Sequence, residues 1–207
     1  MANTFALGIA ISEGESSEAA LTIVEREEEG EPSFVVHETT VAPFDGDVEA
    51  LASDVQGRLA EEPYTARSSV VVRVDNDEGD ALAQALRSRG VRPVRARVRA
   101  ADEGAEPEAD DEVVVDAHAE LFALSNAHRG GTLRMGHHST EDATRLARML
   151  GHLIDDGNEG SEIRADYLGA QGLSALIAYW WSNEQKADPT ERLRADLPGT
   201  ESSDIAA

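Results

Sequence analysis

A cluster of carboxylates follows a short apolar run in the middle of the chain. The run is "SSVVVRV" at 68–74, and Asp75, Asp77, Glu78 and Asp80 come directly after it. Carboxylate oxygens are the ligands that Mg²⁺ and Mn²⁺ prefer, and sites in α/β proteins gather at the carboxyl ends of buried strands. One interpretation is a divalent-metal site around Asp75. The other is a turn in which Asp75 caps the next helix and the later acids stabilise its N-terminus.

A row of arginines comes next and is the second candidate for a site. Its members are Arg87, Arg89, Arg92, Arg95, Arg97 and Arg99. The alternation in "VRPVRARVR" places Arg95, Arg97 and Arg99 on one face of a strand. One interpretation of the Arg87–Arg99 row is a surface for a protein partner or for a nucleic-acid backbone. The other is pairing inside the chain with the acidic loop at 102–112.

The composition of the chain sets the background for both candidates. Its 207 residues include 41 Asp and Glu against 18 Lys and Arg, which gives a net charge of -23. Lys186 is the one lysine, and aromatic residues make up only 4%. Dense carboxylates hold water at a surface, and concentrated salt screens their repulsion. The composition therefore predicts a folded, halophilic and archaeal protein, in which an acidic cluster is by default a solvated surface.

Several classes of site and location are disfavoured by the sequence. The chain has no cysteine, which excludes disulfides, thiolate metal sites and cysteine nucleophiles. It has no phosphate-binding loop of the form G-x-x-x-x-G-K-[ST], and neither G-x-S-x-G nor H-E-x-x-H occurs. No apolar stretch is long enough to span a bilayer, and no secretory signal is visible. We expect a cytoplasmic protein without a membrane partner, and the sequence indicates no oligomeric state.

The elements that must position these residues begin with three predicted strands. They are "TFALGIAIS" at 4–12, "EAALTIVERE" at 18–27 and "SFVVHETTVAPF" at 33–44. Short polar turns separate them, which predicts an antiparallel meander. A helix is expected over 45–62, with Asp45 or Asp47 as its N-cap.

The second half of the pattern alternates strands and helices. The expected elements are a strand at 68–74, a helix at 80–90, a strand at 91–99, a segment at 113–131 that begins extended and becomes helical, a short strand at 132–135, and helices at 139–157 and 161–185. The order β-β-β-α-β-α-β predicts an α/β fold with a mixed sheet, an antiparallel meander followed by βαβ units, flanked by helices. We expect one domain over 1–185 and a flexible polar tail over 186–207.

This order resembles the RNase H-like order, and in particular the nuclease domain of viral large terminases. The stretches that carry the resemblance are "LGIAIS" from Leu7, "VVVRVDNDEG" from Val70, "LRSRGVRPVRARV" from Leu86, "ELFALSNAHRGGTLRMGHHSTEDATRLARML" from Glu120 and "LSALIAY" from Leu173. The resemblance spans roughly residues 5–182 and rests on order and spacing. It implies an RNase H-like mixed sheet.

The resemblance also implies where a catalytic site would lie. Nucleases of this family bring carboxylates from several elements onto two Mg²⁺ or Mn²⁺ ions about 4 Å apart. Asp75 falls on the family's middle aspartate, whereas Ala10 and Ser174 fall where the family has its other two. One hypothesis is therefore a catalytically degenerate relative, a binding or assembly module of viral or mobile-element origin. Another is an active nuclease that uses Mg²⁺ or Mn²⁺ with displaced ligands, and a third is an unrelated protein that shares only the topology.

The displaced-ligand hypothesis names specific residues. The candidate metal ligands are Asp75, Asp77, Glu13, Glu15 and Asp166. Glu13 and Glu15 follow the first predicted strand, and Asp166 precedes Ser174 by about two helical turns. If the chain is degenerate, no cofactor is expected.

Overall fold

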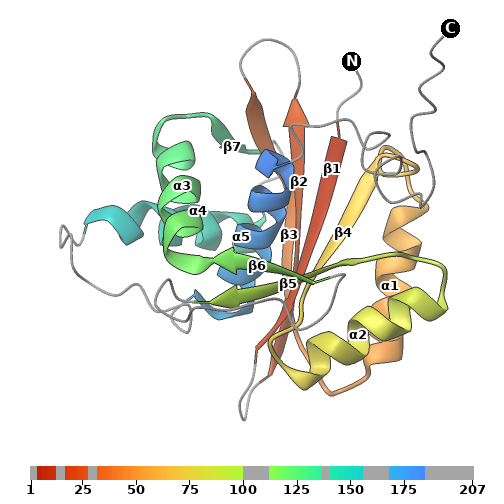
Figure 1. Cartoon of the computed structure of the whole chain (residues 1–207). Coiled ribbons are helices and arrows are strands. Elements are labelled where there is room, and N and C mark those ends of the chain that lie inside the picture. Colours follow the sequence, from red (N-terminus) through yellow and green to blue (C-terminus); the bar gives the residue numbers. More distant parts are fainter. Residues whose placement is uncertain are drawn as a thin grey trace, which may run out of the picture.

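The computed structural model describes residues 4–12, 17–27, 32–99, 112–136, 140–155 and 168–184. These residues form a seven-stranded sheet with helices on both faces (Figure 1). The strands are β1 (Thr4–Ile11), β2 (Glu18–Glu27), β3 (Ser33–Pro43), β4 (Ser68–Arg73), β5 (Val94–Arg99), β6 (Glu112–Asp116) and β7 (Leu133–Met135). The helices are α1 (Val48–Leu59), α2 (Asp77–Ser88), α3 (Ala117–Arg129), α4 (Glu141–Asp155) and α5 (Gly169–Glu184).

The strand order across the sheet is β6-β5-β4-β1-β2-β3-β7. Strands β1, β2 and β3 form the predicted antiparallel meander. Strands β4, β5 and β6 then add in parallel on the other side of β1, and β7 pairs in parallel with β3. The strand order and the helical crossovers are those of an RNase H-like fold, so the predicted fold class is confirmed.

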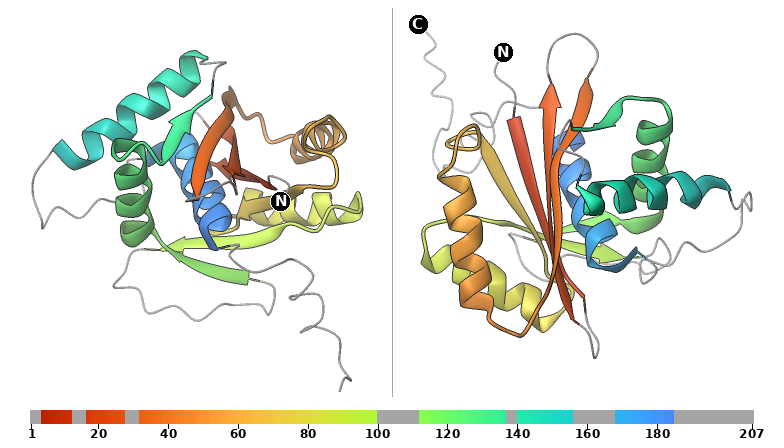
Figure 2. Two further views of the ribbon diagram at one scale, coloured as in Figure 1. Left: turned by 90° about the horizontal axis from the view of Figure 1, so that it is seen from above. Right: turned by 180° about the vertical axis from the view of Figure 1, so that it is seen from behind.

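The helices are divided between the two faces of the sheet. Helices α1 and α2 cover one face, and α3, α4 and α5 cover the other (Figure 2). Alternation along β1 separates the two cores, because successive side chains point to opposite faces. Ile9 and Ile11 pack with α1 and α2, whereas Ala6 and Ala10 pack with α5. The small residues of β1 therefore face α5, where a helix can approach closely.

Gly8 marks the closest approach between α5 and the sheet. A Cβ atom at Gly8 would lie 2.1 Å from the carbonyl oxygen of Ser174 and 2.9 Å from Cβ of Ala178. Real Cβ atoms do not approach other atoms so closely, so glycine is the residue that fits here. The contact fixes α5 directly over β1 and holds Ser174 against the sheet.

Most predicted elements are present with small shifts in their ends. Asp47, one of the two predicted residues, caps α1 by accepting a hydrogen bond from the amide of Ala50 at 2.9 Å. Gly90 follows α2 with φ +83°, as expected of a helix stop. The predicted helix over 161–185 is observed as α5, and 161–167 and the predicted tail at 186–207 lie outside the described residues. Within the described part of the chain, no helix is long and apolar enough to cross a membrane.

Candidate functional site

Two of the three positions matched by the resemblance, Ala10 and Asp75, lie at the same edge of the sheet. Ala10 is near the carboxyl end of β1, and Asp75 lies two residues after the end of β4. Strands β1 and β4 are parallel neighbours, with Ile9 opposite Val72. Ser174 lies on α5, over the middle of β1. The fold thus places Ala10 and Asp75 near the carboxyl ends of neighbouring strands and Ser174 nearer the middle of the sheet.

Arg73 and Asp75 share the α5 side of the sheet. Val71 belongs to the core cluster that contains Ala10 and α5, whereas Val72 and Val74 pack with α1 and α2. Since side chains alternate along an extended strand, Arg73 and Asp75 point to the same side as Val71. The side chain at the edge of the matched site, beside Ala10, is thus a guanidinium group.

Asp75 forms a two-point ion pair with this guanidinium. Arg73 donates from Nε to Oδ1 and from Nη2 to Oδ2 of Asp75, both at 2.5 Å. The two side chains are only 17% and 18% exposed. Bidentate arginine–carboxylate pairs are strong and geometrically specific. Both oxygens of the only carboxylate at a matched position are therefore engaged by a cation of the chain itself.

The predicted cap of α2 was wrong by one residue. Asn76, not Asp75, is the N-cap, and its Oδ1 accepts from the amide of Gly79 at 2.8 Å. Asn76 also donates from Nδ2 to the carbonyl of Ile11 at 2.9 Å, which ties the start of α2 to the end of β1. An amide can donate and accept at once, which an ionised carboxylate cannot. Asn76 can therefore make both contacts, and Asp75 is left to pair with Arg73.

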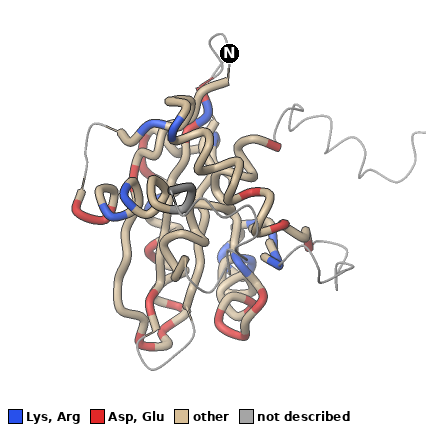
Figure 3. The backbone as a smooth tube through the Cα atoms, turned by 90° about the vertical axis from the view of Figure 1, so that its left-hand side faces the viewer, with Lys and Arg blue, Asp and Glu red and all other residues tan. Residues whose placement is uncertain are grey.

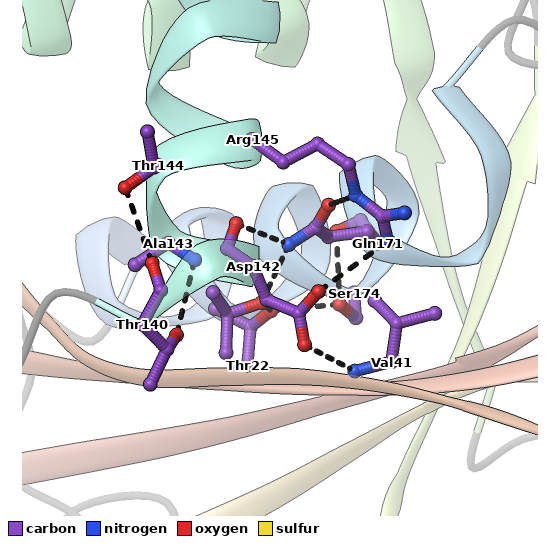
Figure 4. A network of polar contacts seen from close by, with 10 residues as sticks. Thr22, Val41, Thr140, Asp142, Ala143, Thr144, Arg145, Gln171 and Ser174 are labelled. Carbon is purple, nitrogen blue, oxygen red and sulfur yellow. Dashed lines mark hydrogen bonds and ion pairs between the residues drawn. The ribbon is translucent and has the colours of Figure 1, made fainter.

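Ser174 is part of a buried polar network between α5 and the sheet (Figure 4). Its hydroxyl lies 2.8 Å from the hydroxyl of Thr22 on β2, which lies 3.0 Å from that of Thr39 on β3. Ser174 also donates to the carbonyl of Gln171 at 2.9 Å. All three hydroxyl-bearing residues are fully buried. The position where the family has an aspartate is thus occupied by a neutral, hydrogen-bonded side chain.

The network continues to α4 through Gln171 (Figure 4). Gln171 donates to the carbonyl of Asp142 at 2.7 Å and accepts from Nε of Arg145 at 2.9 Å. The carboxylate of Asp142 accepts from the amide of Val41 at 3.1 Å. The sequence interpretation did not identify these residues. The signal that could have found them is the presence of Thr22 and Ser174 inside otherwise apolar runs.

The other candidate metal ligands do not gather around Asp75 in the described residues. Asp77 is exposed at the first position of α2. Glu13, Glu15 and Asp166 lie outside the residues that the structure describes. Over the described ranges, no group of three or more Asp, Glu, His or Cys side chains could hold a metal ion. The displaced-ligand hypothesis therefore depends on residues outside those ranges.

The arginines of β5 are paired inside the protein. Arg97 donates from Nε to Oε1 of Glu112 at 2.6 Å, and Arg95 lies 3.6 Å from the same carboxylate and 2.7 Å from Asp80. The side chain of Glu112 is completely buried, and both arginines are 12% exposed. Arg99 lies opposite Asp116 in the β5–β6 register. Glu112 is the last residue of the predicted acidic loop at 102–112 and the first residue of β6, and 102–111 lies outside the described residues. Asp80 is a partner that the loop interpretation missed.

Acidic residues are spread over most elements, whereas basic residues occur in a few groups (Figure 3). One carboxylate has an unusual environment: Glu120, half-buried on α3. Burial raises the pKa of the Glu120 carboxyl above its usual value, and the charges of Glu184 and Asp116 raise it further. Its Oε2 atom is buried without a hydrogen-bond partner among the described residues. The charged groups that act on the Glu120 carboxylate are therefore other carboxylates and not an arginine.

Comparisons with known proteins give similarity in structure alone. No protein-family model matches the chain, and no curated protein matches its sequence. The chain is similar to the manganese-soaked terminase nuclease domain of human cytomegalovirus, with 11% identity, 91% of this chain and 85% of that chain covered, and a TM-score of 0.48. The same viral domain with an inhibitor bound gives identical values.

A second similar structure is RuvC of Thermus thermophilus. The identity is 14%, the match covers 88% of this chain and 98% of that chain, and the TM-score is 0.40. The RNase H-like fold of this chain is established by its own strand order and crossovers.

Proposed function

We propose that this chain is a catalytically degenerate RNase H-like protein that acts as a binding or assembly module. The observation that carries the proposal is the ion pair between Arg73 and Asp75. Ala10 and Ser174 contribute no carboxylate at the other two matched positions. A two-metal mechanism needs ligands on both sides of the scissile phosphate, and one carboxylate that is already paired does not supply them.

The charge of Arg73 works against a metal ion at Asp75. The guanidinium occupies both carboxylate oxygens, so the pair has no net charge to attract a divalent cation. Mg²⁺ loses its bound water reluctantly and is held through carboxylates that are free to coordinate it. Binding at Asp75 would first require loss of two charge-assisted hydrogen bonds, and a hydrogen bond to a charged group contributes about 1.5–3 kcal/mol.

The proposed setting is the cytoplasm of a halophilic archaeon, where the chain would belong to a virus or another mobile element. The net charge of -23 and the single lysine support the halophilic source. The resemblance of the stretches around Gly8, Asp75 and Ser174 to terminase nuclease domains supports the viral origin.

The proposed module binds its partner, a protein or a nucleic acid, through the Arg87–Arg99 row. Arg95 and Arg97 are largely buried and paired with carboxylates. Arg92, at the turn between α2 and β5, is exposed. The geometry therefore favours the Arg87–Arg92 end of the row as the surface that meets a partner.

A cleavage assay tests the proposed loss of catalysis. The full chain would be incubated in molar KCl with Mg²⁺ or Mn²⁺ and with single-stranded, double-stranded and branched DNA and RNA. We expect no cleavage above the level of the metal alone. Metal-dependent cleavage that disappears in Asp75→Ala would overturn the proposal and support the nuclease with displaced ligands, with Glu13, Glu15, Asp77 and Asp166 as the next residues to replace.

A reconstructed variant tests the role assigned to Arg73. The double variant Ala10→Asp, Arg73→Gln frees Asp75 and places a second carboxylate on the adjacent strand. We expect Mn²⁺ to raise the melting temperature of this variant, because an ion that binds only the folded state stabilises it. The unmodified chain and the single variant Arg73→Gln are the controls. An equal Mn²⁺ response in the unmodified chain would show that Arg73 does not block the site.

A further inference from the structure

Two neighbouring hollows lie at the amino ends of β4 and β5, opposite the edge that carries Asp75. The first has a volume of ≈ 340 Å³, and its lining includes Leu59, Tyr64, Ser69, Val70, Val91 and Arg92. The second has a volume of ≈ 540 Å³ and is lined by Arg87, Gly90, Arg92 and Pro93. Arg92 lines both hollows.

The first hollow is lined by both apolar and polar groups. Its lining includes Leu59, Val70 and Val91, and its volume lies within the range of about 300–1,000 Å³ for small-ligand pockets. Ala66 on its wall has φ +60°, in the left-handed region that a non-glycine residue rarely adopts. The amide of Arg67 donates to the carbonyl of Tyr64 at 3.2 Å and holds this turn in place. The side chains of Leu59, Val70 and Val91 in this lining offer apolar contacts to a partner.

The second hollow provides the positive charge. Arg92 is exposed and forms no ion pair with any residue that the structure describes. Arg89 on the same turn is held by Glu49 at 2.8 Å, so it is already compensated. In a chain with a net charge of -23, Arg92 thus adds an exposed positive charge beside the apolar side chains of the first hollow.

We propose that these two hollows bind an acidic peptide segment of a partner protein in which an apolar side chain lies next to a carboxylate. The apolar side chain enters the hollow formed by Leu59, Val70 and Val91, and the carboxylate pairs with Arg92. Arginine presents a fork of donors that matches a carboxylate. This inference rests on the proposed function as a binding module and specifies its partner.

The same features disfavour a nucleic acid at this surface. Single-stranded nucleic acids are bound by exposed aromatic rings and by basic grooves that follow the backbone. The ring of Tyr64 is buried and packs edge-to-face on Phe5 at a centroid distance of 5.2 Å.

An NMR titration of the full chain in molar KCl tests the proposal. The probe is the blocked peptide Gly-Asp-Leu-Glu-Gly. We expect saturable shifts of the amide signals of Ser69, Val91 and Arg92, and about tenfold weaker binding to Arg92→Gln. Arg148→Gln is the matched control, because Arg148 is also exposed and has no ion pair among the described residues but lies on α4. Its affinity should equal that of the unmodified chain.

Peptide controls separate the two contributions. The peptide Gly-Asn-Leu-Gln-Gly lacks the two carboxylate side chains, and the peptide Gly-Asp-Ala-Glu-Gly lacks the leucine. Each should bind about tenfold more weakly than Gly-Asp-Leu-Glu-Gly or not at all. The proposal fails if no probe gives saturable shifts at these residues, if Arg92→Gln binds as tightly as the unmodified chain, or if a dodecathymidylate displaces the peptide. If the peptide fails to bind and no metal-dependent cleavage occurs, only this inference falls. Metal-dependent cleavage would overturn the proposed function whatever the peptide does.

Discussion

Arginines at the two ends of the β4–β5 strand pair differ in whether they are paired with carboxylates. At the carboxyl end, Asp75 takes Arg73, and along β5 the buried carboxylate of Glu112 lies between Arg95 and Arg97. At the amino end, Arg92 is exposed and has no carboxylate partner within the described ranges. The difference does not come from composition, because acidic residues are abundant throughout the chain.

Burial accounts for the contrast between the two ends. A buried guanidinium is costly unless it is paired and hydrogen-bonded, so a fold that buries Arg97 must also supply Glu112. An exposed arginine is solvated by water and needs no partner. An arginine that stays uncompensated at the surface is therefore free to take a partner from another molecule, whereas the buried arginines serve the fold.

The largest effect is expected when salt is removed. The net charge of -23 is unscreened in dilute buffer, and repulsion between exposed carboxylates then opposes the compact state. We expect the melting temperature, followed by circular dichroism, to fall steeply from molar KCl to dilute buffer. An unchanged melting temperature would remove the halophilic interpretation and would mean that the surface charges are compensated as well as the buried ones.

The next largest effect is expected at the paired arginines of β5. Glu112→Gln removes a carboxylate that is completely buried between Arg95 and Arg97, so it should lower the free energy of unfolding by about 3 kcal/mol. Glu49→Gln is the matched control, because Glu49 pairs with Arg89 but is 70% exposed. Its effect should stay below about 1 kcal/mol. Denaturant titrations at constant salt would show whether the buried pair contributes more to the free energy of unfolding than the exposed pair.

An intermediate effect is expected at the carboxyl end of β4. Asp75→Ala leaves the partly buried Arg73 without its carboxylate and should cost about 2 kcal/mol of unfolding free energy. Asp77→Ala, at an exposed first-turn position, should cost about 0.5 kcal/mol through the helix dipole. A double-mutant cycle with Arg73→Gln isolates the pair. Absence of coupling between residues 73 and 75 would contradict the contact on which the proposed function rests.

The smallest effect is expected at Glu120, where a carboxylate has no arginine. Because burial raises the pKa of Glu120 above the usual value of 4.5, the folded state binds this proton more tightly than the unfolded state. Stability should therefore fall as the pH rises from about 4.5 through the raised pKa. Glu120→Gln should be more stable than the unmodified chain at neutral pH and should lose this advantage below pH 4. Melting curves of both proteins would be measured across this pH range. A difference in melting temperature that stays constant with pH would contradict the prediction.

The fold was predictable from the sequence because its elements are local. The three strands of the meander alternate clearly, and glycines and aspartates mark the ends of the helices, as Gly90 and Asp47 illustrate. The order of these elements, together with the rule that parallel crossovers are right-handed, leaves few possible sheets. The observed sheet contains the predicted antiparallel meander and the predicted parallel strands.

The interactions at the site were less predictable because they depend on pairs of residues. The position of Asp75 followed from the strand pattern, but its partner Arg73 is recognised only when both residues are known to share a face. The cap provided by Asn76 depends on the carbonyl of Ile11, 65 residues earlier. Ser174 meets Thr22 across 152 residues. A periodic pattern contains no information on such distant partners.

The close packing at Gly8 limits which side chains position 174 can carry. An aspartate at position 174 would place a charge among the buried hydroxyls of Thr22 and Thr39. Helix α5 cannot move away easily to admit water, because its backbone is seated on Gly8. The single substitution Ser174→Asp would thus bury an unpaired charge and destabilise the fold. A carboxylate at this position would require coordinated changes on α5, β1 and β2.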